Sequence, residues 1–183
     1  MLVLVVGPSG AGKDTLLDGA RARLAGDGRF HFVRRAITRQ AASGGEAHEA
    51  LTPAEFAARE AAGGFALTWQ AHGLSYGIPA DIAGLLAEGR IVIANVSRAV
   101  IETAAKRFPT TVVEITAPAE ILAARLGLRG REGQADITAR LARNVGLPPG
   151  IAIERVINDA TAQAGIARFL AAISRATRSA PPA

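Results

Sequence analysis

Residues 2–15 read LVLVVGPSGAGKDT, and this stretch decides the fold. Its first five residues are aliphatic, which predicts a buried strand. A glycine-rich turn follows at once, and backbone N–H groups in such a turn face a bound anion together with the positive end of the next helix. After the turn, apolar residues recur at helical spacing, namely Leu16, Leu17, Ala20 and Leu24. The stretch therefore predicts a strand, a phosphate-binding loop and a helix.

The spacing of the glycines and the lysine in this loop is typical of a nucleoside triphosphate site. Lys13 is expected to reach the β- and γ-phosphates, while the loop amides hold the rest of the triphosphate. A tight turn without a ligand is the less favoured interpretation. The residues expected to bind the nucleotide here are Gly7, Pro8, Ser9, Gly10, Ala11, Gly12, Lys13, Asp14 and Thr15.

Asp14 departs from the usual pattern, in which a Ser or Thr directly after the lysine binds magnesium. A carboxylate in the first turn of a helix gains only about 0.3 to 1 kcal/mol from the helix dipole. Repulsion by a nearby triphosphate outweighs that gain unless a cation lies between the two charges. Asp14 and Thr15 are therefore the predicted Mg²⁺ ligands, Asp14 either directly or through bound water.

The remainder of the chain alternates between short β-rich runs and helix-like stretches. After residues 2–6, such runs occur at residues 32–37, 91–96, 112–115 and 155–157. This alternation predicts an α/β fold with a parallel sheet flanked by helices. With 183 residues, of which 49% are hydrophobic, the chain is expected to form one domain over residues 1–178, followed by a disordered tail at 179–183.

Two segments are expected to interrupt the core, which then consists of residues 1–37 and 79–175. The first is a small insert at about residues 38–78 that holds a substrate. Within it, Thr52-Pro53-Ala54-Glu55 predicts a helix start, Gly63-Gly64 its end, and residues 65–70 a strand. The second segment, at about residues 120–143, is dense in arginine and contains Gly130 and Gly133, which predicts a hinged lid.

The composition narrows the classes of function. The chain has no cysteine, which excludes disulfides and thiolate chemistry and suits a reducing cytoplasm. No apolar run is long enough to cross a bilayer, so no membrane association is expected. Of the 21 basic residues only Lys13 and Lys106 are lysines, and arginine suits anionic substrates, although genome composition explains the bias equally well. Aromatic residues make up only 4%, which disfavours a nucleic-acid partner.

Several motifs in fixed order extend the pattern beyond the phosphate loop. They are Ile37-Thr38-Arg39, Gly45-Glu46, Trp69, His72-Gly73-Leu74-Ser75-Tyr76-Gly77-Ile78-Pro79, the arginine-dense segment and Ile157-Asn158-Asp159. Over residues 2 to 171 the chain resembles the guanylate kinase superfamily, and within it most closely the ribose 1,5-bisphosphate phosphokinases. The resemblance implies a guanylate-kinase-like P-loop kinase with an acceptor-binding insert and an arginine-rich lid.

Departures from the guanylate kinase pattern separate the two subfamilies. A second arginine usually follows the one matched by Arg39, but here residues 40–43 are Gln-Ala-Ala-Ser. An acid that reads guanine usually stands about where Ser97 falls, and its loss leaves guanine unrecognised. Asp14, the run from Gly44 to His48 and the stretch Asn95-Val96-Ser97-Arg98 resemble the ribose bisphosphate kinases instead.

The resemblance implies transfer of the γ-phosphoryl group of ATP to the 1-phosphate of ribose 1,5-bisphosphate, with Mg²⁺, giving 5-phosphoribosyl 1-diphosphate. The acceptor is already an anion near neutral pH, so no general base is expected. By this resemblance Arg39 and Tyr76 grip the acceptor phosphate, and Asn158 lies near adenine. The expected catalytic set is Lys13, Asp14, Arg125, Arg129, Arg131 and Arg140, and the expected substrate-binding set is Arg39, Glu46, His72, Ser75, Tyr76, Ser97 and Arg98.

Three other functions remain open at this point. A true guanylate kinase would phosphorylate GMP. A non-catalytic guanylate-kinase-like binding module would not need the phosphate loop, and a nucleotide-dependent switch would hydrolyse ATP or GTP without an acceptor. His48, in an expected loop, could contact substrate, and His72 is equally well explained by a positioning hydrogen bond and by ligand contact. The oligomeric state is left open.

Overall fold

The computed structural model describes residues 1–39, 47–127 and 150–178. Its larger sheet has five strands in the order β2-β7-β1-β8-β9, and every neighbouring pair is parallel. The strands are β1 (Leu2–Val6), β2 (Phe30–Phe32), β7 (Ile91–Asn95), β8 (Thr110–Thr116) and β9 (Ile153–Ile157). The predicted α/β fold with a parallel sheet flanked by helices is confirmed.

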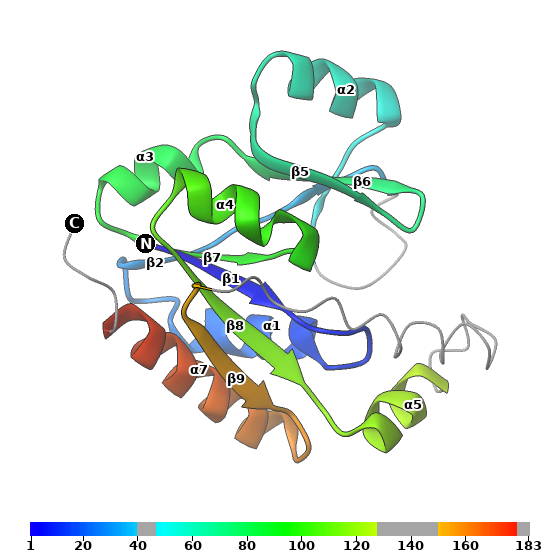
Figure 1. Ribbon diagram of the computed structural model, residues 1–183, viewed down its shortest axis with the longest axis vertical. Coiled ribbons are helices and arrows are strands. Elements are labelled where there is room, and N and C mark those ends of the chain that lie inside the picture. The colour runs from blue at the N-terminus through cyan, green and yellow to red at the C-terminus, as the bar shows by residue number, and fades with distance from the viewer. Residues whose placement is uncertain (40–46, 128–149, 179–183) are drawn as a thin grey trace.

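Helices cover both faces of this sheet (Figure 1). On one face, β1 residues Val3 and Val5 pack with α1 and α7 through Leu16 and Phe169. On the other face, Leu2, Leu4 and Val6 pack toward α3 and α4. The helices are α1 (Lys13–Arg23), α3 (Ile82–Ala87), η2 (Arg98–Val100), α4 (Ile101–Arg107), α5 (Ala119–Gly127) and α7 (Ala162–Arg178).

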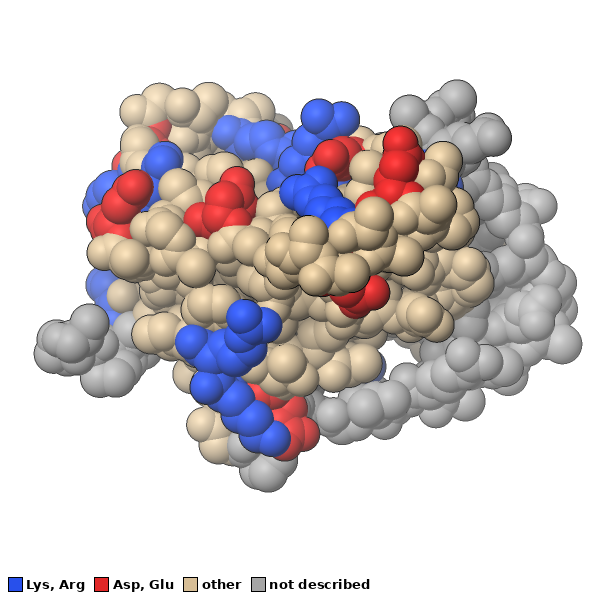
Figure 2. All heavy atoms as spheres, turned by 90° about the horizontal axis from the view of Figure 1, so that it is seen from above, with Lys and Arg blue, Asp and Glu red and all other residues tan. Residues whose placement is uncertain are grey.

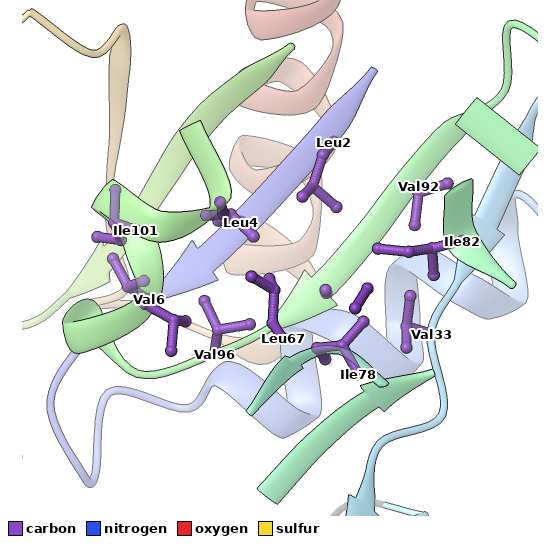
Figure 3. Close-up of a cluster of buried hydrophobic side chains, with 14 of the residues drawn as sticks. Leu2, Leu4, Val6, Val33, Leu67, Ile78, Ile82, Val92, Val96 and Ile101 are labelled. Carbon is purple, nitrogen blue, oxygen red and sulfur yellow. The ribbon is translucent and has the colours of Figure 1, made fainter. Parts of the chain in front are cut away.

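A second sheet of four strands carries the order β4-β3-β6-β5. It contains β3 (Ala36–Ile37), β4 (Glu49–Ala50), β5 (Phe65–Ala71) and β6 (Leu74–Pro79). Leu67 of β5 and Ile78 of β6 belong to the same buried cluster as Leu2, Leu4 and Val6 of β1, as Figure 3 shows. The smaller sheet is therefore fixed to the larger one by a shared apolar core.

The helix α2 (Pro53–Ala61) begins as the sequence predicts. The Thr52 hydroxyl accepts a hydrogen bond from the backbone N–H of Glu55, and the Glu55 carboxylate accepts one from the backbone N–H of Thr52. This reciprocal pair satisfies donors that the first helical turn leaves open.

Figure 2 shows the molecule from above, and on this face acidic and basic side chains are interspersed.

The prediction of one strand over residues 32–37 is wrong. Phe30–Phe32 pairs with β7 in the larger sheet, whereas Ala36–Ile37 pairs with β4 and β6 in the smaller one. The chain passes from one sheet to the other at residues 33–35, a change that a continuous β-rich run does not reveal. Most of the predicted lid and the tail 179–183 lie outside the described residues. Within the described ranges, no helix combines the length and apolarity needed to cross a membrane.

Candidate active site

The phosphate loop between β1 and α1 has a backbone that glycine allows. Gly7, Gly10 and Gly12 have φ angles of 151°, 84° and 83°, a range that side chains with a Cβ rarely adopt. A Cβ on Gly7 would also overlap the carbonyl oxygen of Ile115 at the end of β8. The loop is therefore pressed against the carboxyl ends of the strands, where parallel α/β sheets bind ligands.

Lys13 is the first residue of α1, and its ammonium group returns over the loop. The Nζ atom donates to the carbonyl oxygens of Gly7 at 2.7 Å and Pro8 at 3.0 Å. The first N–H groups of a helix lack partners within the helix. Lys13 and these amides thus supply one positive charge and several donors to the same small region.

Asp14 is linked to the neighbouring strand by Asn95. Asn95 ends β7 and is buried, and its Nδ2 lies 3.4 Å from Oδ1 of Asp14. Thr15 follows on the exposed side of α1. In the described ranges no three His, Cys, Asp or Glu side chains are grouped to hold a metal ion. Mg²⁺ in nucleotide sites commonly takes only one or two carboxylates besides the substrate phosphates, so the oxygens of Asp14 and Thr15 fit its requirements.

Asn158 and Arg125 brace the loop from the other side. Asn158 is only 5% exposed, and its Nδ2 donates to the carbonyl oxygen of Ala11 at 2.8 Å. Nη1 of Arg125 donates to the carbonyl oxygens of Asn158 at 3.1 Å and Gly10 at 3.5 Å. Both side chains, from segments more than 100 residues away in the sequence, therefore fix loop backbone.

The segment that carries Asn158 is itself anchored by α7. Nη1 of Arg168 donates to the carbonyl oxygen of Ile157 at 2.7 Å and to Oδ1 of Asp159 at 2.6 Å. The side-chain hydrogen bond from Arg168 lowers the pKa of the Asp159 carboxyl below its usual value. Gly165 completes the packing, since a Cβ there would lie 2.5 Å from Oδ1 of Asn158.

The smaller sheet carries the residues predicted to bind the acceptor. Tyr76 of β6 stacks on Trp69 of β5, with ring centroids 5.2 Å apart and planes 6° from parallel. Nη2 of Arg39 lies 3.5 Å from Nδ1 of the buried His48. Nε of Arg39 is buried without a hydrogen-bond partner in the described part of the chain. Arg39 is therefore held next to His48, while Tyr76 and Trp69 form a separate aromatic pair on the neighbouring strands.

Ser75 and His72 contribute to the backbone structure of the smaller sheet, Ser75 through hydrogen bonds and His72 through a turn. The backbone N–H of Ser75 donates to Oγ1 of Thr38 at 2.8 Å, and the backbone N–H of Thr38 donates to the carbonyl oxygen of Ser75 at 3.0 Å. His72 and Gly73 form the two-residue turn between β5 and β6, with φ angles of 53° and 71°. Two positive φ angles in succession are typical of a hairpin turn that follows the sheet twist.

Ser97 and Arg98 lie after β7 and have partners within the chain. The Ser97 hydroxyl accepts from the backbone N–H of Ala99 at 3.3 Å and so caps η2. Arg98 forms an ion pair of 2.7 Å with Glu114, whose side chain is 9% exposed. Glu114 also accepts from Arg155 at 2.9 Å. The positive charge of Arg98 is therefore matched by a buried carboxylate.

Four predicted residues are not placed by the structure. Glu46 in the insert and three lid arginines lie outside the described residues, namely Arg129, Arg131 and Arg140. The structure thus brings together the phosphate loop, Asp14, Arg125 and Asn158 in one cluster. Arg39, Ser75 and Tyr76 belong to the smaller sheet and its margin.

Known proteins resemble the chain over almost its whole length. It is 52% identical over 174 residues to the ribose 1,5-bisphosphate phosphokinase PhnN of Acidiphilium cryptum, covering 95% of this chain and 92% of that protein. It is 54% identical over 149 residues to the PhnN protein of Brucella melitensis, covering 81% and 78%. The chain belongs to the ribose 1,5-bisphosphate phosphokinase family. The family resemblance expected from the motifs is confirmed.

Some members of the phosphokinase family are parts of larger proteins. The bifunctional ribose 1,5-bisphosphokinase-thymidine phosphorylase of Azorhizobium caulinodans is 53% identical over 175 residues. This match covers 94% of the chain, which spans only 25% of that protein. Across the bifunctional relatives the chain spans between 25% and 29% of their length.

No family model matches the chain. Solved structures, however, confirm the fold of this chain. The structure of guanylate kinase from Anaplasma phagocytophilum superposes with a TM-score of 0.63 at 16% identity, covering 98% of this chain and 86% of that one. A gluconokinase from Sinorhizobium meliloti 1021 gives a TM-score of 0.53 at 17% identity, with coverage of 96% and 93%. At these identities the likeness is one of fold.

Three residues of the site were missed by sequence reasoning. Asn95 was noted only as part of a motif, yet it contacts Asp14. Glu114 stands in a strand of apolar residues and pairs with Arg98. Arg35, which lies beside Tyr76, comes from a run interpreted as a strand. A charged residue inside an apolar strand is the one available signal, and it applies to Glu114 alone.

Replacing Asn158 with alanine should weaken the binding of ATP, GTP and inorganic tripolyphosphate by the same factor, about fivefold. The reason is that the lost hydrogen bond, worth about 1 kcal/mol, supports the loop backbone at Ala11. Calorimetric titration of the three ligands measures the factor. A change in the ratio of ATP to GTP affinity would instead place the Asn158 amide on the base.

Proposed function

We propose that this chain transfers the γ-phosphoryl group of ATP to the 1-phosphate of ribose 1,5-bisphosphate, giving 5-phosphoribosyl 1-diphosphate. The observation that carries the proposal is the 52% identity with a ribose 1,5-bisphosphate phosphokinase over 92% of that protein. The loop around Lys13 supports it, because a triphosphate needs this cradle of amides and positive charge.

Phosphoryl transfer to an existing phosphate needs placement and charge compensation more than proton removal. The loop amides and Lys13 hold the triphosphate at the carboxyl end of β1. Arg39 and Tyr76 hold the acceptor on the smaller sheet. Since the transition state of such a transfer is loose and strongly anionic, these donors act by aligning the two phosphates and by offsetting their repulsion.

Asp14 and Thr15 would hold Mg²⁺, which would neutralise negative charge on the phosphates when bound. Asn95, buried at the end of β7, places its amide Nδ2 3.4 Å from Oδ1 of Asp14 and so helps to orient this carboxylate. Arg125 fixes Gly10 and Asn158 in this structure, so it contributes to loop geometry. The lid arginines Arg129, Arg131 and Arg140 are proposed to contact the transferring group.

Replacing Asp14 with alanine should raise the magnesium concentration needed for half-maximal rate by about 10- to 100-fold, as loss of an orienting group at a metal site does. The rate at saturating magnesium should fall less. Initial rates over a magnesium series measure the effect, and calorimetric ATP titrations with and without magnesium provide a second readout. An unchanged magnesium dependence would make Asp14 a helix-start residue only.

The proposed function is tested by the release of ADP in the presence of ribose 1,5-bisphosphate, GMP or no acceptor. Of these three conditions, only the one with ribose 1,5-bisphosphate is expected to release ADP rapidly. Phosphorus NMR should then identify the diphosphate product. Rapid turnover with GMP alone would make the protein a guanylate kinase. Equal turnover without acceptor would identify a nucleotide hydrolase, and the absence of nucleotide binding would indicate a binding module.

A further inference from the structure

The strand β7 ends beside the phosphate loop, and its last residue is Asn95. In the larger sheet β7 is a parallel neighbour of β1, and Asn95 is level with Val5. The backbone N–H of Val96 donates to the carbonyl oxygen of Val5 at 3.0 Å, so the two strands remain paired almost to the start of the loop. Asn95 is therefore held in a fixed position relative to the loop.

The side chain of Asn95 lies on the face of the sheet that α1 covers. Side chains two apart on a strand share a face, and Ile93 belongs to the buried cluster that includes Leu16 and Leu17 of α1. Asn95 is only 4% exposed, and its Nδ2 lies 3.4 Å from Oδ1 of Asp14 in the first turn of α1. Strand pairing, face and distance thus agree in placing the amide against the carboxylate.

The direction of this contact follows from the chemistry of the two groups. An ionised carboxylate only accepts hydrogen bonds, so the amide of Asn95 is the donor. An acid on the strand would lack this donor. Two carboxylates at this separation would repel each other, and the repulsion is strengthened because position 95 is buried. The amide at the end of β7 is therefore suited to an acid on α1.

Phosphate-loop enzymes that use Mg²⁺ ordinarily have the opposite arrangement. A Ser or Thr follows the loop lysine, and an Asp from a strand outside the loop supplies the carboxylate. Here the acid follows Lys13 directly, and the strand beside the loop ends in an amide. Each arrangement brings one carboxylate and one uncharged polar group together, whereas mixing the two gives either two carboxylates or none.

We propose that Asp14 and Asn95 form an exchanged pair, in which α1 instead of the strand carries the carboxylate for Mg²⁺ and Asn95 is the positioning residue for it. This proposal rests on the proposed function, because it takes the bound nucleotide to be a magnesium complex. By holding Oδ1, the amide limits rotation of the carboxylate before the nucleotide binds. Groups that orient a metal ligand in this way commonly change metal affinity by about 10- to 100-fold.

A cycle of four proteins tests the pair, namely the wild type, Asp14→Ser, Asn95→Asp and the double variant. Thermal unfolding is measured without metal or nucleotide at about pH 8, where carboxyl groups are ordinarily ionised. Asn95→Asp alone should lower the Tm by about 2 to 4 °C or more, because it brings two carboxylates together. The double variant should regain most of this loss. An equal fall in Tm with Ser at position 14 would show that Asn95 acts independently of Asp14.

Calorimetric titration of ATP over a magnesium series gives the second readout. The magnesium concentration that produces half of the gain in ATP affinity should rise about 10- to 100-fold in Asp14→Ser. In the double variant it should return to within about threefold of the wild type, because the carboxylate is again present on the strand. A double variant as impaired as Asp14→Ser would overturn the exchange.

Asn95→Ala tests the positioning role without introducing a charge, and it remains informative if Asn95→Asp does not fold. The magnesium concentration for half of the gain in ATP affinity should rise about tenfold, while the Kd for ATP without magnesium changes less than about twofold. Equal weakening of ATP binding with and without magnesium would make Asn95 a structural residue only.

The matched control for the charge is Asp18→Ser, which removes an acid from the exposed side of α1, where Asp18 pairs with Arg21. It should leave the magnesium dependence of ATP binding unchanged, since exposed pairs of this kind contribute little. A change equal to that of Asp14→Ser would attribute the effect to net charge and overturn the assignment.

None of these measurements contains an acceptor, so their outcome is separable from that of the proposed function. If the wild type turns over ribose 1,5-bisphosphate but the double variant shows no recovery, only the exchanged pair fails. If the pair behaves as expected and another acceptor is phosphorylated, the pair stands and the reaction must be revised. If ATP binding by the wild type does not respond to magnesium, the exchanged pair fails whatever the acceptor.

Discussion

Replacing Gly12 with alanine should reduce ATP affinity and turnover by about 100-fold or more. Gly12 has a φ of 83°, and a Cβ there would lie 2.5 Å from Nδ2 of Asn158. The Asn158 amide cannot move away, because it is buried, its Nδ2 is hydrogen-bonded to the carbonyl oxygen of Ala11, and its Oδ1 lies close to Gly165. The loop must shift instead, and a misplacement of about 1 Å at a reacting group costs on the order of 10²-fold.

Gly63→Ala is the control for this substitution. Gly63 has a φ of 72°, but a Cβ there would meet no atom within 4 Å. It should lose about 1 to 2 kcal/mol of stability from the left-handed backbone alone and keep full activity. Calorimetry with ATP, steady-state rates and thermal unfolding distinguish the two variants. Full ATP affinity in Gly12→Ala would show that the loop does not depend on the contact with Asn158.

Replacing Lys13 with methionine should lower kcat by about 10²- to 10³-fold, the range found when one preorganised donor to developing charge is removed. Methionine keeps much of the aliphatic length and loses the ammonium group. The same change also removes the hydrogen bonds from Nζ to Gly7 and Pro8, so the loop should lose part of its order before nucleotide binds. Single-turnover measurements report the chemical step, and the Kd for ATP reports the loop.

Lys106 is the other lysine of the chain and provides the comparison. It is exposed and pairs with Glu102 one helical turn away on α4. Lys106→Met removes the same charge from the surface, where such pairs contribute little, and should leave kcat within twofold. Equal losses in both variants would mean that net charge, and not the position of Lys13, governs the rate.

Much of the fold could be predicted because the deciding signals are local. Five aliphatic residues before the glycine loop predict β1, and the Thr52 and Glu55 pair predicts the start of α2. The division between the two sheets could not be predicted in the same way. Residues 32–37 read Phe-Val-Arg-Arg-Ala-Ile and contain no glycine or proline to mark a break, so only pairing with β7 at one end and β6 at the other separates them into two strands.

The site was predictable to the extent that it follows a motif. The loop residues and Lys13 are recognised by their spacing. The supporting contacts are not, because Asn95 to Asp14 and Asn158 to Ala11 join segments 81 and 147 residues apart. The same limit applies to Arg98, whose buried partner Glu114 is supplied by another strand. Sequence spacing indicates which groups are present, but tertiary packing decides which of them face a ligand.

The shared core beneath the smaller sheet has a consequence for how acceptor preference can be altered. Leu67 and Ile78 pack in the same core as Leu4 and Val6 of the central strand, so the segment from Ala36 to Pro79 does not form a separate unit. Transferring this segment to a related protein would leave voids or steric clashes in the core between the two sheets. A new acceptor preference is therefore more readily reached by single replacements on the exposed side of the sheet than by exchanging the segment as a block.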